Sequence, residues 1–316
     1  MAKTRVFYVT DLHGSDRMFY KFINAAPVYK AQILVVGGDI AGKIITPIIQ
    51  TNGSYSVRVR GTDRTATTNE ELEAMKREIR AVGDYPYVTT QNEWHNITAE
   101  PTKMDRLFDS LITESIGIWC KTAEERLKAS GVRVIMNKGN DDPTIVQELV
   151  LRSGFVEWPD ERVIDVGGHE MMSLGYSNMT PWKLPGDIPE EELEKKIESL
   201  VSQMKNVSNS IFNIHVPPYG THLDVAPKLD ENLKPVLASG GQPEMANVGS
   251  IAVKRAIEKY QPSVGLHGHI HESRGTVKIG KTYCFNPGSE YSTGVLRGVI
   301  LDFSEKKLES HILTAG

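Results

Sequence analysis

The sequence is poor in cysteine. Its 316 residues include only two, Cys120 and Cys284, which lie far apart and fit no metal-ligand or redox spacing. This argues against a disulfide framework and favours a reducing compartment. We therefore expect both cysteines to be buried, small apolar groups in a cytoplasmic protein.

Long hydrophobic runs are missing as well. The N-terminal segment meets Asp11 after an apolar run too short for a signal peptide, and no later stretch approaches ~18 uninterrupted apolar residues. We therefore expect no membrane segment and a cytoplasmic location.

The chain also lacks an excess of charge of one sign. Thirty-six Lys and Arg stand against 40 Asp and Glu, for a net charge of -4. No broad positive field would attract nucleic acid or an anionic membrane, so neither is an expected partner. An anionic ligand must be held by a local site, and the oligomeric state is left open.

What the chain does contain is the composition of an ordinary globular protein, with 40% hydrophobic and 24% charged residues. Short β-branched runs alternate with helical patterns, which predicts α/β layers around a mostly parallel sheet. After residue 270 the pattern changes to closely spaced strands, with a hairpin corner expected at residues 286–289. The predicted strands are residues 6–10, 33–36, 132–136, 211–214 and 263–266. The predicted helices are residues 15–26, stopped by Pro27, 143–152, 189–204 and 249–260.

One interval breaks this alternation. About a hundred residues separate Asp39 from Asn140, where a βα unit needs roughly 30 to 40. We predict a single domain over residues 1–316, interrupted at 43–130 by an insertion that acts as a cap or a partner surface. Within it we expect a hairpin at 55–60, a charged helix at 69–82 and a long amphipathic helix at 102–129, facing a core or a partner.

Polar side chains follow every predicted buried strand, at the carboxyl end where open α/β sheets bind ligands. Taken singly, each has a structural explanation: Asp39 fits a turn, Asp142 a helix cap before Pro143, and His215 a core histidine. Their joint occurrence at one sheet edge favours a metal site instead. The residues are Asp11, His13, Asp39, Asn140, Asp141, His215, His269 and His271.

The chemistry of these donors narrows the choice of metal. Carboxylate, amide and imidazole groups without thiolate suit Mn, Fe or Zn better than Ca or Mg alone. If the site holds two divalent ions, as the family resemblance given in the next paragraph implies, Asp11 and Asp39 alone leave about two positive charges in excess. Such an excess binds phosphate and acidifies a bridging water.

Five blocks of these residues resemble the signature of the calcineurin-like metallophosphoesterases, in that family's order from residue 11 to residue 271. The blocks are Asp11-Leu12-His13-Gly14, Gly37-Gly38-Asp39, Gly139-Asn140-Asp141, His215-Val216-Pro217-Pro218 and Gly268-His269-Ile270-His271. The resemblance implies an α/β fold, a four-layer α-β-β-α sandwich with mixed sheets. It also implies two divalent ions, for which manganese is our first choice. One ion would be held by Asp11, His13 and His271, the other by Asn140, His215 and His269, with Asp39 bridging them.

The third block departs from the family pattern. Many members have His after the Asn, where it acts on the substrate phosphate or the leaving group, but this chain has Asp141. A carboxylate beside two cations has a lowered pKa and is a poor proton donor. Three alternatives stay open: the leaving group departs unaided, a hydrated metal supplies the proton, or another residue such as His222 does.

We therefore predict a metal-dependent phosphoric ester hydrolase that uses a metal-bridging hydroxide on a small phosphoester or nucleotide. The missing histidine favours a phosphodiesterase. The residues assigned to catalysis are Asp39, Asn140, Asp141 and His222. The alternatives are a phosphomonoesterase or nucleotidase, a nuclease, which the lack of a basic track disfavours, and a catalytically silent binding module, which the complete ligand set disfavours.

Overall fold

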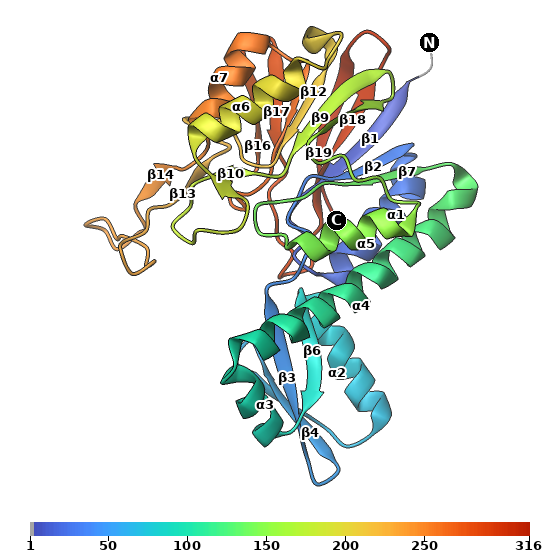
Figure 1. The fold of residues 1–316 in the computed structure, drawn as a ribbon, viewed down its shortest axis with the longest axis vertical. Coiled ribbons are helices and arrows are strands. Elements are labelled where there is room, and N and C mark those ends of the chain that lie inside the picture. The colour runs from blue at the N-terminus through green and yellow to red at the C-terminus, as the bar shows by residue number, and fades with distance from the viewer. Residues whose placement is uncertain (1–2) are drawn as a thin grey trace.

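A computed structural model describes residues 3–316 of the chain. Its centre consists of two mixed β-sheets (Figure 1). The strands of the first sheet are β1 (Thr4–Val9), β2 (Ile33–Val36), β7 (Arg133–Met136), β18 (Arg297–Phe303) and β19 (Leu308–Ala315), in the order β19-β18-β1-β2-β7. The strands of the second are β8 (Arg162–Val166), β9 (His169–Leu174), β12 (Ile211–Ile214), β15 (Val264–Leu266), β16 (Gly275–Ile279) and β17 (Thr282–Asn286), in the order β16-β17-β15-β12-β9-β8.

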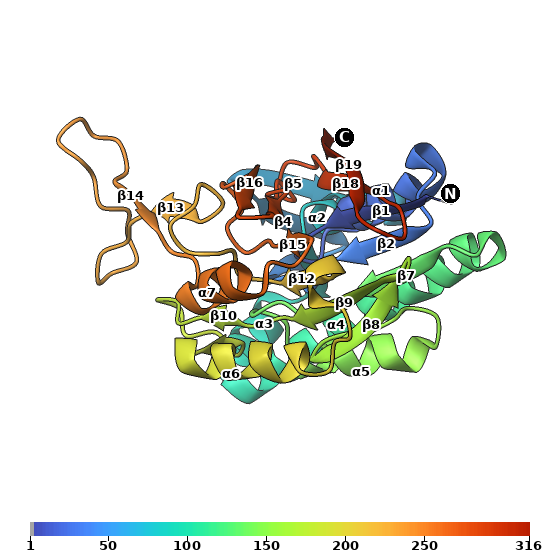
Figure 2. The same cartoon turned by 90° about the horizontal axis from the view of Figure 1, so that it is seen from above.

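Apolar side chains fill three interfaces between four layers. Tyr8, Ile211 and Leu301 belong to the buried cluster that joins the inner faces of the two sheets. The outer face of the first sheet packs against α1 (Asp16–Tyr29), α5 (Thr144–Ser153) and part of α4 (Pro101–Leu127). The outer face of the second packs against α6 (Glu190–Val201) and α7 (Ile251–Tyr260) (Figure 2). The predicted α-β-β-α sandwich is confirmed, and both cysteines are buried and free.

The prediction that Pro27 stops the first helix is wrong. Helix α1 continues through Pro27 to Tyr29 and ends at Lys30, whose N–H donates to Ala26 in a left-handed cap. Pro27 has no N–H to donate to the preceding turn, so the helix loses one backbone hydrogen bond there. The helix ends soon afterwards, at the left-handed cap on Lys30.

Between β2 and β7 the chain builds a separate small sheet, which Figure 1 shows below the main body. Its elements are β3 (Ile44–Thr51), β4 (Ser54–Val59), β5 (Thr62–Ala66), α2 (Asn69–Ala81), β6 (Asp84–Thr89) and α3 (Gln91–Thr98). The sheet order is β5-β4-β3-β6. The run predicted as one hairpin is β4, the middle strand of a meander, because it pairs antiparallel with both β3 and β5. A role of this unit as a cap or partner surface stays a prediction.

Helix α4 connects the small sheet to the body. Near its C-terminal end, the Trp119 ring stacks on Phe19 of α1 with centroids 4.5 Å apart, and its Nε1 donates to Asp16 at 2.7 Å. Near its N-terminal end, Phe108 packs edge-on against Tyr85 of β6, with centroids 6.4 Å apart. The amphipathic pattern of this helix therefore faces a core, which is one of the two alternatives that the sequence left open.

Residues 286–289 do not form a hairpin corner. Strand β17 lies in the second sheet and β18 in the first, so the chain crosses between sheets here. The Asn286 side chain accepts a hydrogen bond from the N–H of Gly288 at 2.8 Å, and Ser289 Oγ donates to the carbonyl of Asp11 at 2.7 Å. The turn thereby joins the two sheets next to the first motif block.

Two further short pairs complete the fold. Strands β10 (Ser177–Asn178) and β11 (Asp187–Ile188) lie beside the third motif block, and β13 (Val225–Pro227) and β14 (Met245–Asn247) form the base of an arm that projects from the body in Figures 1 and 2. Within residues 3–316, no helix is both long enough and apolar enough to cross a bilayer.

Candidate metal centre

The motif residues gather where strands of the two sheets end. Asp11 and His13 follow β1, Asp39 follows β2, and Asn140 follows β7, three neighbouring strands that run parallel. In the second sheet, His215 follows β12, and His269 and His271 follow β15, which again runs parallel to its neighbour. Parallel strands bring their carboxyl ends to one edge, so residues far apart in the chain become neighbours.

Asp11, His13 and His271 form the first group. His271 Nε2 lies 3.3 Å from Asp11 Oδ1 and 3.0 Å from His13 Nε2. One potential ligand atom from each of the three residues lies within 4.8 Å of those of the other two. Their arrangement matches the set that the sequence assigns to the first ion.

His215, His269 and Asn140 lie beside it. His215 Nε2 is 3.5 Å from Asp39 Oδ1, and His269 Nδ1 is 3.0 Å from Asn140 Oδ1. Asp39 faces both groups, because its Oδ2 lies 3.7 Å from His13 Nε2 while its Oδ1 faces His215. The Asp39 carboxylate therefore lies between the two groups.

A buried and unsatisfied nitrogen tests whether these residues suit a cation. His215 Nδ1 lies 3.1 Å from the carbonyl of Gly37 and donates to it, so Nε2 is the nitrogen that remains for a ligand. Among the described residues, Nε2 has no hydrogen-bond partner although the side chain is fully buried. A nitrogen directed toward Asp39 and Asp11 has the surroundings of a metal ligand.

Most of the protonation states agree with metal binding. Burial lowers the pKa of His13 to about 3 and that of His269 to about 4, so both imidazoles are neutral at pH 7. Burial opposes ionisation of Asp39, but His215 and His13 outweigh it and hold its pKa well below the usual range. Burial also lowers the pKa of His215, yet Asp39 and Asp11 raise it to about 9, so without a cation this imidazole is protonated at pH 7 and a bound metal ion would have to displace that proton.

The backbone at the site is strained. Asp11, His13, Asp39 and His269 all adopt positive φ, at 55°, 44°, 50° and 66°. Such a conformation in a residue other than glycine costs about 1 kcal/mol or more. Four of the seven assigned ligands therefore depend on the surrounding structure to hold them in place.

Two motif glycines are needed for close approach. A Cβ on Gly139 would lie 2.0 Å from Asp39 Oδ1, and one on Gly268 would lie 2.0 Å from Thr10 Oγ1 and 2.5 Å from Asp11 Oδ2. Any side chain at either position would displace a carboxylate of the site.

The Asp142 carboxylate holds backbone segments of the site together and does not cap the helix that follows. Its carboxylate accepts backbone N–H groups of Ile40, Ala41 and Gly139 at 2.8 to 3.0 Å, which ties the second motif block to the third. The N-cap of α5 is Pro143, without a side-chain hydrogen bond. Burial raises the pKa of Asp142 to about 7.

Asp187 contacts an assigned ligand and was not singled out by the sequence. Its Oδ1 accepts from Asn140 Nδ2 at 2.8 Å, and its Oδ2 accepts from the N–H groups of Thr180 and Leu184. Because a carboxylate only accepts, it binds the Asn140 amide nitrogen and leaves the amide oxygen facing His269. A lone Asp in a two-residue strand carries no sequence signal for this contact.

Lys43 is a second residue that the sequence did not reveal. Its ammonium contacts the carboxylate of Asp141, and a carboxylate oxygen of Asp141 lies within 4.8 Å of ligand atoms of His13 and Asp39. Burial and Asp39 raise the pKa of Asp141 above its usual value, while Lys43 lowers it. The expectation of a lowered pKa considered only the metal ions and neither burial nor Lys43. The Tyr291 ring packs beside the His13 ring, with the two ring centroids 4.7 Å apart.

His222 is the one assigned residue that the structure does not bring to the centre. Its side chain is exposed, and its Nε2 hydrogen-bonds to the carbonyl of Thr276 in β16 at 3.0 Å. The groups of potential ligands found among the described residues do not include it.

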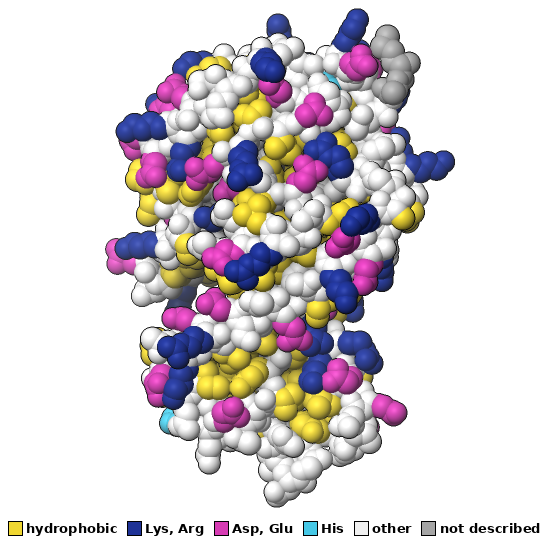
Figure 3. Space-filling view, turned by 45° about the vertical axis from the view of Figure 1, so that its right-hand side comes forward, with side chains coloured by type: hydrophobic (Ala, Val, Ile, Leu, Met, Phe, Trp, Pro, Cys, Tyr) yellow, Lys and Arg dark blue, Asp and Glu magenta, His cyan; other side chains and the backbone are white. Residues whose placement is uncertain are grey.

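One face of the molecule is mixed in charge. On the described part of the face in Figure 3, basic and acidic side chains are interspersed and form no track of one sign.

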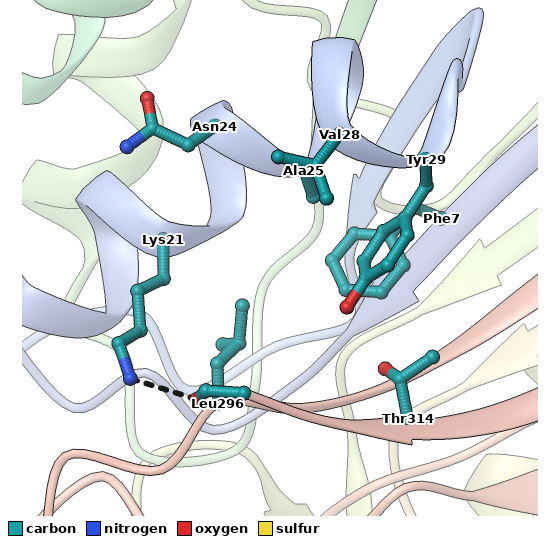
Figure 4. Close-up of a pocket in the computed structure, with 9 residues that line it drawn as sticks. Phe7, Lys21, Asn24, Ala25, Val28, Tyr29, Leu296 and Thr314 are labelled. Carbon is teal, nitrogen blue, oxygen red and sulfur yellow. Dashed lines mark hydrogen bonds between the residues drawn. The ribbon is translucent and has the colours of Figure 1, made fainter.

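A separate cavity of about 190 Å³ lies between α1 and the C-terminal strands, lined by Phe7, Val28, Tyr29 and Leu296 (Figure 4). Lys21 closes one side of it by donating to the carbonyls of Gly294 and Gly316, and none of the assigned ligands lines it.

Comparison with known proteins gives one clear relative. The uncharacterized protein MJ1162 of Methanocaldococcus jannaschii is 30% identical over 180 residues, which cover 55% of this chain and 73% of that protein. No protein-family model matches the chain. Among solved structures, TT1561 of Thermus thermophilus aligns over 100% of this chain and 99% of its own with 13% identity and a TM-score of 0.55.

An archaeal phosphodiesterase of known structure aligns over 98% of this chain and 100% of its own, with 11% identity and a TM-score of 0.37, which adds no argument about activity. The family assignment therefore rests on MJ1162, of which the match covers 73%. The chain belongs to one family with MJ1162.

Proposed function

We propose that the protein is a dinuclear metal-dependent phosphoester hydrolase with a preference for diesters. The observation that carries this proposal is the convergence of Asp11, His13, Asp39, His215 and His271, with Asn140 and His269 beside them. Two divalent ions, when bound, supply an acidified water for attack on phosphorus and neutralise charge on the phosphoryl oxygens. Manganese is the first candidate among Mn, Fe and Zn.

The residues of the chain hold this centre in a defined form. Asp39 joins the two halves, and Asp187 orients Asn140. The carboxylates of Asp11 and Asp39 leave the site short of negative charge once two divalent cations are bound, which supports an anionic substrate.

The identity of residue 141 supports a diester over a monoester. The chain has Asp141 where many members of the resembled family have the His that acts on the substrate phosphate or the leaving group. The Asp141 carboxylate is paired with Lys43 and is a poor proton donor in place of that histidine. Because the imidazole of His222 is engaged by Thr276, we leave it out of the proposed reaction. The leaving group then departs unaided or receives a proton from water.

The direct test combines metal stoichiometry with a matched pair of substrates. The protein is stripped with chelator, reconstituted separately with Mn, Fe and Zn, and analysed by mass spectrometry for bound metal. We expect two ions per chain and faster turnover of bis(p-nitrophenyl) phosphate than of p-nitrophenyl phosphate.

Other outcomes identify the competing functions. Faster monoester turnover would indicate a phosphomonoesterase or nucleotidase, and cleavage of single-stranded DNA a nuclease. Two bound metals without turnover on any ester would indicate a binding module. A cytoplasmic location remains a prediction, supported by the two free, buried cysteines.

A further inference from the structure

Lys43 is the first residue of the insertion and the one basic side chain paired with the third motif block among the described residues. The segment before it is tied down on both sides. The N–H groups of Ile40 and Ala41 donate to Asp142 in the body, while the N–H of Gly42 donates at 2.9 Å to Tyr85 Oη in the insertion. The backbone that carries Lys43 therefore has a defined position relative to Asp39.

The ammonium of Lys43 lies at the rim of the centre. It contacts Asp141 Oδ2, and Asp141 shares its cluster with His13 and Asp39. The Lys43 side chain keeps 42% of its surface exposed, so a ligand can reach it from solvent. The Asp141 side chain is more buried, so the pair is open to solvent on the Lys43 side.

We propose that Lys43 binds the phosphoryl group of the substrate and that Asp141 holds its ammonium in position. This proposal rests on the proposed function, because it assigns a substrate contact at that centre. An ammonium has three N–H donors, so the contact with Asp141 leaves two for phosphoryl oxygens.

The pairing of Lys43 with Asp141 also compensates the negative charge of Asp141. Without Lys43, the Asp141 carboxylate would stand uncompensated next to the incoming phosphate. With Lys43, the pair is neutral overall and presents its positive end to an anion. Lys43 thus provides a cationic contact at the block where many family members have His.

The test measures binding of inorganic phosphate to the Mn-reconstituted protein by calorimetry, together with metal content and melting temperature. For Lys43→Met we expect about 10- to 100-fold weaker phosphate binding, the size of a lost charge-assisted hydrogen bond, with two metals retained and the melting temperature unchanged. Lys43→Arg should recover most of the affinity. Lys43→Met combined with Asp141→Asn should bind phosphate more tightly than Lys43→Met alone, because the uncompensated carboxylate is gone.

Lys76→Met is the matched control, since Lys76 forms an ion pair with Glu73 on α2. Wild-type phosphate affinity in Lys43→Met would overturn the proposal. Loss of bound metal in Lys43→Met would overturn it as well, because Lys43 would then act on the metal centre itself. Failure of the proposed function would appear separately, as wild-type protein that binds no metal or hydrolyses no ester.

Discussion

The double-sheet body and the insertion are built on different principles. In the body, every assigned metal ligand follows a strand whose side chains are packed on both faces, and several ligands hold strained backbone. The insertion has its own cluster around Ile48, Val57 and Ile79, and its sheet pairs with no strand of the body. The body therefore determines where the donors lie, and the insertion determines what surrounds them.

The two regions share a hydrophobic cluster through Ile45, Tyr85 and helix α4, and polar contacts join them as well. Tyr85 Oη accepts from Gly42, and Arg60 donates at 2.6 Å to the carbonyl of Ser292, next to Tyr291. Arg60 is thus engaged in joining the insertion to the loop beside the centre. From this difference we expect that a substitution in the body affects metal binding, whereas a substitution in the insertion affects substrate binding first.

The largest effect is expected from Asp39→Asn in the body. Removing the carboxylate that faces both groups should leave one metal or none per chain. Turnover should fall by more than about 100-fold, beyond the range for residues that only support a ligand. Metal analysis and diester hydrolysis measure this, with Asp63→Asn, an exposed insertion carboxylate, as the control. Two retained metals with normal turnover would contradict the bridging assignment.

Ile79→Ala tests the insertion in isolation. Ile79 is fully buried in the insertion cluster, so truncation should cost about 2 to 5 kcal/mol of local stability. Hydrogen exchange should rise in α2 and β4, while two metals remain bound to the body. If metal is lost in step with the insertion's protection, the two regions are one cooperative unit and the comparison fails.

Asp187→Asn should separate the two halves of the centre. Loss of the carboxylate that orients Asn140 should weaken binding of one metal by about 10- to 100-fold and leave the other unchanged. Titration of the metal-free protein with Mn, followed by calorimetry, would show one affinity equal to that of the wild type and one that is weaker. Equal weakening at both sites would show that Asp187 acts on the fold as a whole.

A smaller effect is expected from Asp160→Asn, which probes the cost of burial in the body. Burial raises the pKa of Asp160 to about 6, and its Oδ1 accepts from the N–H of Gly175 at 2.8 Å. The folded state then holds a proton that the unfolded state releases near pH 4, so stability falls as pH rises from about 4 to above 6.

Asparagine keeps the acceptor and removes the titration. It should therefore stabilise the protein by about 1 to 2 kcal/mol at pH 8 and by little at pH 4. Denaturant melts at the two pH values measure this, and Asp63→Asn should show no such difference. A gain that is equal at both pH values would refute the titration of Asp160 as its cause.

Much of the fold and of the candidate site could be predicted from residue types and their spacing. Buried β-branched runs predicted the strands that precede the motif blocks, because their periodicity is a property of local sequence. Other strands were missed: β9 contains His169 and Glu170, and β8 contains Asp165, so neither reads as an apolar run. Asp142 was visible in a motif block, but its role required knowing that residues 40 and 41 lie beside it.

The sequence by itself determined which candidate donors follow the strands, because ligand chemistry belongs to the side chain, and their order along the chain follows the order of the strands. Only the tertiary structure decided which residue supports which. Asp187 meets Asn140 across 47 positions, and Lys43 meets Asp141 across the whole insertion. Such pairings depend on how strands and loops pack in space, and no local pattern of residues encodes them.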